Sequence, residues 1–191
     1  MTKQSFHRSL RRRSQAGTSL VEVTIALAVL FIASSGIMGL CAIAMTTTEN
    51  QGHLMARTAE YSQDKMEQLI SLAYTDTLSN TATFPTSSSG GSGLAVGGSS
   101  NPDAPTTNYV DYLDFNGNPL AIGVSAPANW FYIRVWNISN VAGAPSFGTV
   151  GPTMKLITVT TEVRRGVAGV GGGGGLAPQA TMTSIMTYPK P

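Results

Sequence analysis

The fold of this chain is decided near its N-terminus by the stretch RRRSQAGTSLVEVTIALAVLF, residues 11–31. Three arginines precede a glycine, and an apolar run follows in which Glu22 is the one acid. From Val23 to Met45 no residue is charged, which is long enough for a helix to span a bilayer. Because the basic residues lie before the run, the positive-inside rule predicts a cytoplasmic N-terminus and a single membrane pass.

The net charge of +2 is unevenly placed along the chain. Residues 1–17 carry five basic side chains and no acid, whereas the remainder carries seven bases and ten acids. The basic segment lacks the interleaved aromatic residues of a nucleic-acid site, so it indicates membrane topology and no nucleic-acid partner. A single cysteine, Cys41, excludes an intrachain disulfide and a cysteine-based metal site.

An amphipathic helical pattern continues beyond the apolar run. Apolar residues recur at three- and four-residue steps among polar ones, namely Met55, Ala59, Met66, Leu69, Ile70 and Ala73. We therefore expect one helix from about Ser19 to Tyr74, on the order of 80 Å long at 1.5 Å per residue. Its apolar stripe is expected to dock on the domain that follows.

The C-terminal half predicts an antiparallel sheet of about four strands. Alternating or β-branched segments occur in NYVDYLDF (108–115), NWFYIRVWNI (129–138), MKLITVTTEVRR (154–165) and ATMTSIMTY (180–188). A turn is expected at FNGNP and a glycine-rich hairpin loop at GVAGVGGGGGLAP. The predicted fold class is α+β, a long N-terminal helix, membrane-spanning in its first half, packed on this sheet. The predicted segments are a leader (1–17), a membrane or filament-core helix (18–46), an amphipathic helix (47–74), a flexible Gly/Ser-rich loop (75–108) and the sheet domain (109–191).

Other export signals fit the apolar run poorly. A secretory signal peptide has an apolar core of roughly 7 to 15 residues, and this run is much longer. An A-x-A sequence, Ala42 to Ala44, lies only at its far end. A lipoprotein site at Cys41 would need a small residue before it, where Leu40 stands. No twin-arginine match extends past the arginine pairs.

The residues from Gly17 to Glu22 resemble the prepilin processing site of type IV pilins and type II secretion pseudopilins. In that class a basic leader ends in glycine, a membrane peptidase cuts after it and methylates the new N-terminus, and the fifth mature residue is glutamate. Counted from Thr18, the fifth residue is Glu22. The resemblance implies cleavage between Gly17 and Thr18, N-methylation of Thr18, and an assembly contact made by Glu22. Thr18 stands where the class usually has phenylalanine, and the usual helix proline is missing.

The chemistry of Glu22 agrees with this resemblance. An ionised carboxylate in lipid costs a few kcal/mol or more unless a cation is near it. In a filament of bundled apolar helices, Glu22 can meet the free amine of Thr18 in a neighbouring subunit. Such a buried pair fixes register more than it adds stability. Alternatively, Glu22 lies in the headgroup zone and is solvated.

A second resemblance concerns the C-terminal half, which is similar to the sheet of minor pilins of the pilus-modification type and of the I-type minor pseudopilin. A Trp-containing strand is followed by a K-x-I-T-V strand and a Thr-rich strand; the matching residues are Trp136, Lys155, Ile157, Thr158, Val159 and Glu162. The implied function is that of a minor pilin that primes or modifies pilus assembly, with adhesion as a further role of the class.

The implied partners are the prepilin peptidase, other major and minor pilins, the inner-membrane platform with its ATPase, and membrane lipid. The implied location is the bacterial inner membrane, with a periplasmic C-terminal domain, and then the filament. Two alternatives stay open, a type II secretion minor pseudopilin and a bitopic membrane protein with a periplasmic binding domain. The sequence does not separate pilus from secretion system or name a tip ligand.

The residues do not suggest an enzyme or a cofactor. The only histidines are His7, in the leader, and His53, on the predicted helix, so no set of reactive groups converges. One segment, DYLDFNGNP, is oxygen-rich like a calcium loop, with Asp111, Asp114, Asn116 and Asn118 as the candidate ligands. Pro119 replaces the glycine of a calcium loop, and no closing glutamate follows, so an Asn-Gly hairpin turn is preferred and no metal site is predicted.

Overall fold

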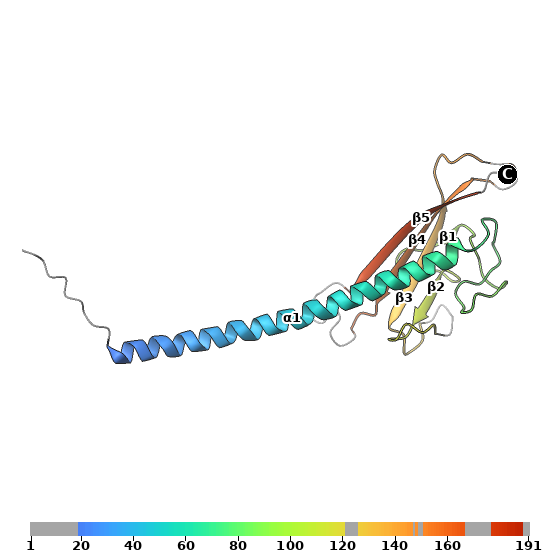
Figure 1. Ribbon diagram of the computed structural model, residues 1–191. Coiled ribbons are helices and arrows are strands. Elements are labelled where there is room, and N and C mark those ends of the chain that lie inside the picture. The colour runs from blue at the N-terminus through green and yellow to red at the C-terminus, as the bar shows by residue number, and fades with distance from the viewer. Residues whose placement is uncertain (1–18, 121–125, 147, 149–150, 167–176, 189–191) are drawn as a thin grey trace, which may run out of the picture. The chain divides into compact units, whose positions relative to one another are not determined.

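The computed structural model describes residues 19–120, 126–146, 148, 151–166 and 177–188. Its elements are α1 (Leu20–Ile70), β1 (Gly97–Gly98), β2 (Val110–Leu113), β3 (Tyr132–Asn140), β4 (Met154–Val163) and β5 (Gln179–Thr187), shown in Figure 1. The chain forms two compact units, Met1–Met45 and Thr46–Pro191, and α1 contributes to both. The predicted α+β class, with a long N-terminal helix and an antiparallel sheet, is confirmed.

Helix α1 begins where the sequence predicts and ends four residues earlier. At its start the Ser19 carbonyl accepts the N–H groups of Glu22 at 2.9 Å and Val23 at 3.2 Å. A carboxylate in the first turn is favourable because the amide dipoles leave positive charge at a helix N-terminus. After Ile70 the chain leaves the helix through a bond from the Leu72 N–H to the Leu69 carbonyl, 3.2 Å long.

The sheet is antiparallel throughout and is built around β3. Strand β4 pairs with the full length of β3, and β5 pairs with the far side of β4. The other side of β3 is shared between β2 at one end and β1 at the other. The fifth strand, β1, was missed because it has two residues, both glycine. At Gly98 only glycine fits, since a Cβ would lie 2.1 Å from the Trp136 carbonyl oxygen.

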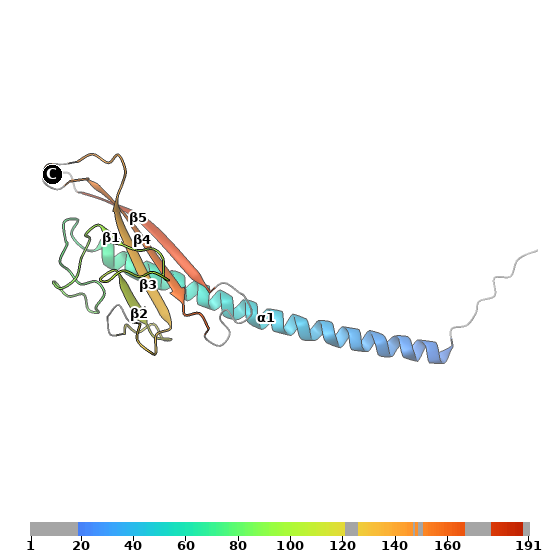
Figure 2. The ribbon, with the colours of Figure 1, turned by 180° about the vertical axis from the view of Figure 1, so that it is seen from behind.

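One face of the sheet packs on the C-terminal half of α1, as the two opposite views in Figures 1 and 2 show. Met66 and Leu69 of the helix join Trp136, Ile138, Ile157 and Val159 of the sheet in the main core. Burial of these side chains is the dominant favourable contribution to the packing. Because side chains alternate across a strand, Ile157, Val159 and Val163 of β4 point to the same face, and all three are buried.

The predicted apolar stripe of the helix was only partly right. Met66 and Leu69 are buried, but Met55, Ile70 and Ala73 are exposed. The buried helix face consists of Thr58, Tyr61, Ser62, Lys65, Met66 and Leu69. Three of these six, Thr58, Ser62 and Lys65, are polar, and the sheet offers a hydroxyl partner to Ser62 and a carboxylate partner to Lys65. Ser62, for example, donates to the Thr161 hydroxyl oxygen at 2.8 Å.

The segment predicted as a Gly/Ser-rich loop, residues 75–108, contributes to the core despite its composition. Leu94 is fully buried and Ala82 nearly so. The ammonium of Lys155 donates to the carbonyls of Tyr74 and Leu94, both at 2.8 Å. Polar composition alone therefore conceals how a few apolar residues and backbone carbonyls attach this segment to the sheet.

Candidate functional site

The first half of α1 exposes an apolar surface on all sides. Every residue from Ser19 to His53 is exposed, including Leu20 at 82% and Phe31 at 76%. Monomeric soluble proteins rarely expose contiguous apolar patches larger than a few hundred Å². The helix is long and apolar enough to cross a membrane, which makes it a candidate membrane anchor.

Three hydroxyl groups in the apolar part of the helix, those of Thr24, Ser34 and Ser35, donate to carbonyls of the helix itself. Thr24 donates to the Leu20 carbonyl at 2.7 Å, and Ser34 donates to the Leu30 carbonyl at 2.7 Å. Ser35 donates to the Ile32 carbonyl at 2.8 Å. An unpaired polar group is costly where there is no water, so these bonds suit a helix placed in lipid.

Glu22 is the one charged side chain in the apolar half of α1. Its side chain lies in the first turn among Val21, Ile25 and Ala26, and no charged residue occurs between Glu22 and Glu49. Among the residues that the structure describes, no cation lies within ion-pairing distance of its carboxylate. The predicted processing residues Gly17 and Thr18, and the whole leader, lie outside the described residues.

A second site, which the sequence analysis missed, is a buried ion cluster between α1 and the sheet. Lys65 of the helix contacts Asp111 of β2, with 2.7 Å between Nζ and Oδ2. Arg134 of β3 holds the same carboxylate with two bonds, Nε to Oδ1 at 2.7 Å and Nη2 to Oδ2 at 2.8 Å. Asp111 and Arg134 are direct cross-strand partners in the β2–β3 pairing. One carboxylate thus connects the helix to two strands.

The remaining N–H groups of the Lys65 ammonium also donate hydrogen bonds. Nζ donates to the Thr81 carbonyl and to Gln68 Oε1, both at 2.6 Å, and lies 4.5 Å from the centre of the Trp136 ring. The side chain is only 1% exposed. A buried ammonium persists only when paired and hydrogen-bonded, and this geometry meets both conditions.

Burial and pairing shift the titration of this cluster in opposite senses. Burial lowers the pKa of Lys65 to about 8, although the Asp111 carboxylate favours the charged form. For Asp111 burial works to raise the pKa, but Arg134 and Lys65 outweigh it and hold that pKa below its usual value. At neutral pH the cluster therefore has two cations and one anion. Not all buried polar atoms nearby are satisfied, since Trp136 Nε1 and Thr81 Oγ1 have no partner among the described residues.

A sequence signal for this cluster exists. Lys65 lies four residues after Tyr61 and four before Leu69, which places it on the buried helix face. Asp111 is the one charged residue of β2, and Arg134 is the one charged residue of β3. Charged residues of opposite sign at positions that the sequence pattern predicts to be buried are expected to pair with one another. Only the tertiary structure identifies which of them form the pairs.

The structure separates the four residues weighed as calcium ligands. Asp111 belongs to the ion cluster, where it pairs with Lys65 and Arg134. Asp114, Asn116 and Asn118 gather in the predicted turn, where Asp114 Oδ1 accepts the N–H groups of Asn116 and Asn118, both at 2.8 Å. Hydrogen bonds to Asn118 and Asn116 hold the pKa of Asp114 below its usual value. The described part of the chain holds no group of three or more His, Cys, Asp or Glu placed to bind a metal.

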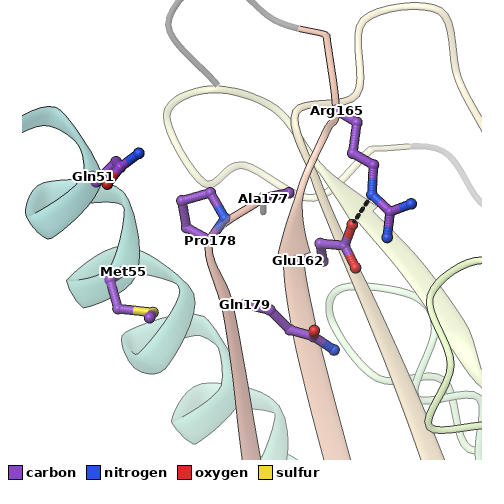
Figure 3. A pocket seen from close by; sticks show the side chains of 7 residues that line it. All are labelled: Gln51, Met55, Glu162, Arg165, Ala177, Pro178 and Gln179. Atoms are coloured by element: carbon purple, nitrogen blue, oxygen red, sulfur yellow. Dashed lines mark hydrogen bonds and ion pairs between the residues drawn. The ribbon is translucent and has the colours of Figure 1, made fainter. Parts of the chain in front are cut away.

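A hollow of about 530 Å³ lies between α1 and the ends of β4 and β5 (Figure 3). Gln51 and Met55 face it from the helix, opposite Pro178. Its acid, Glu162, accepts a bond of 2.8 Å from Arg165 Nε, and Arg165 also pairs with Asp103 at 3.2 Å. The acid and base of this hollow are thus bonded to one another, and neither is poised for proton transfer.

Comparisons with protein-family models, with the curated proteins and with the solved structures find no match to this chain. The architecture itself, a long N-terminal apolar helix packed on an antiparallel sheet, is pilin-like. What the chain does must therefore be argued from its own residues.

Proposed function

We propose that this chain is a structural filament subunit of the type IV pilin class, a minor pilin that is held in the inner membrane before assembly. The observation that carries the proposal is Glu22, the one charge in the apolar first half of α1, which exposes its side chains on every side. Bundling such helices removes their apolar surface from water or lipid, and the carboxylate then needs a cation from a neighbour.

The sequence supplies that cation if the leader is removed. Cleavage after Gly17 would create an amine at Thr18, four residues before Glu22. An α-amine is protonated at neutral pH or close to it, so it can neutralise the carboxylate of an adjacent subunit. The basic leader and the pilin-like architecture support the same proposal.

The first test is the intact mass of the membrane-extracted protein, expressed with and without a prepilin peptidase. We expect a peptidase-dependent loss of residues 1–17 and the addition of one methyl group at Thr18. A full-length chain under both conditions would contradict the proposal and favour a bitopic anchor with a periplasmic domain.

The second test addresses assembly. Glu22→Ala is expected to insert into the membrane normally but to be lost from sheared filaments, because the carboxylate is needed only between subunits. Glu49→Ala is the matched control, since it removes the next acid of the same helix beyond the apolar run. Equal incorporation of Glu22→Ala and wild type would refute the assembly contact. Co-purification with pilus or secretion components separates a minor pilin from a pseudopilin.

A further inference from the structure

Beside the buried ion cluster lies a second hollow, of about 360 Å³, whose wall includes Arg134. Two of the guanidinium nitrogen atoms, Nε and Nη2, are bonded to Asp111. The third, Nη1, has no hydrogen-bond partner among the described residues. The arginine is 8% exposed, so its orientation is set by the carboxylate behind it.

The charges behind this wall do not balance. Lys65 and Arg134 supply two cations and Asp111 one anion, which leaves one positive charge in a region nearly closed to water. An anion bound against Arg134 would neutralise this excess positive charge. Binding an anion here requires little further desolvation or ordering of Arg134, because its guanidinium is buried and held in place by Asp111 before any ligand arrives.

Two aromatic side chains also line the same hollow. Tyr61 comes from α1, and Phe84, which is 78% exposed, comes from the following segment. Pockets of this kind bind an apolar body against rings and fix its orientation with a few polar groups. Asp64 also lines the hollow and is exposed, so it opposes any anion that enters.

From these features we infer that the hollow is a binding site for a small carboxylate with an apolar or aromatic body, with Arg134 as the carboxylate contact. The carboxylate could belong to a free organic acid or to an acidic side chain of a polypeptide. This inference does not depend on the proposed assembly role, since every residue involved lies in the unit Thr46–Pro191.

The test is a titration of the full chain, in an uncharged detergent, with phenylacetate at pH 7. The side-chain Nε–H resonance of Arg134 and the amide of Gly117 are followed by NMR. We expect both to shift with one saturating curve, and phenethylamine, which has the same ring but a positive charge, to produce no such shift. A linear response, or equal binding of phenethylamine, would overturn the inference.

Variants at exposed positions test the site without removing the buried Arg134. Asp64→Asn is expected to tighten phenylacetate binding by about two- to fivefold, because it removes a like charge at moderate distance. Glu67→Gln, the control on the same helix but outside the hollow, should change nothing. Unchanged affinity in Asp64→Asn would count against the site.

A second pair of variants tests the aromatic wall. Phe84→Ala is expected to weaken binding about tenfold through lost ring contact, and Leu78→Ala, also exposed but not in the wall, should not. Equal effects of the two would overturn the assignment. The blocked dipeptide acetyl-Phe-Asp-amide distinguishes a polypeptide carboxylate from a free organic acid. If the dipeptide binds more tightly than phenylacetate, the natural ligand is an acidic side chain of a polypeptide. If it binds more weakly, the natural ligand is a free acid.

Discussion

Replacing Asp111 by alanine should remove the buried ionic connection between helix α1 and the sheet. The carboxylate accepts three charge-assisted contacts of 2.7 to 2.8 Å, and its two cationic partners are 1% and 10% exposed at their side chains. Truncating it leaves two buried cations facing one another without an anion between them. Breaking a buried pair in this way typically costs about 3–5 kcal/mol.

A loss of that size is a large part of the stability of an ordinary domain, about 5–15 kcal/mol. Lys65 limits it, because a buried lysine without its anion can release its proton and become neutral. The assay is urea unfolding of the full chain in detergent, followed by tryptophan fluorescence, since Trp130 and Trp136 both lie in the sheet unit. At roughly 1.5 kcal/mol per molar urea, the midpoint should fall by about 2–3 M.

Asp103→Ala is the matched control for this experiment. Asp103 also pairs with an arginine, Arg165, but both side chains are more than 60% exposed, so solvent screens the interaction. Its midpoint should hardly move. Similar midpoints for the two variants would refute the reasoning that burial gives the Asp111 cluster its importance.

Two further predictions concern the same region. The pKa of Lys65 is about 8 in the folded chain and about 10.5 in the unfolded chain. Between these two pH values the unfolded chain binds more protons than the folded chain. The free energy of unfolding should therefore rise with pH across this window, by at most about 3 kcal/mol. Unfolding free energies measured from pH 7.5 to 9.5 should show this rise, and a rise undiminished in Lys65→Met would contradict it. Gly117→Ala should cost about 2 kcal/mol, because φ is +86° and the new Cβ would lie 2.3 Å from the Tyr61 hydroxyl oxygen. Gly143→Ala, at φ +75° with open space around it, is the control for the backbone strain alone, and equal losses would show that the Tyr61 contact is unimportant.

The turn at Asp114 to Asn118 illustrates how local chemistry was enough for prediction. An Asn-Gly pair between two extended segments predicts a hairpin turn, and the structure has Gly117 at positive φ with the Asp114 carboxylate accepting the turn's N–H groups. Alternation, or aromatic and β-branched composition, in the same way predicted the three long strands β3, β4 and β5. These features depend on neighbours only a few residues apart.

The buried helix face and the ion cluster could not be obtained in this way. Lys65 is not part of the predicted apolar stripe, since lysine is rarely buried without a partner, and its partner is 46 residues further along the chain. Which carboxylate it meets depends on how β2 and β3 align and on where α1 crosses the sheet.

The sequence by itself therefore determined the apolar span, the lone acid at Glu22, the α+β order and most strands, because length, charge and periodicity act locally. Only the tertiary structure decided that Lys65, Asp111 and Arg134 form one buried cluster beside an open hollow. Electrostatic pairing across a core depends on distances between elements, and those distances exist only once the helix has packed on the sheet.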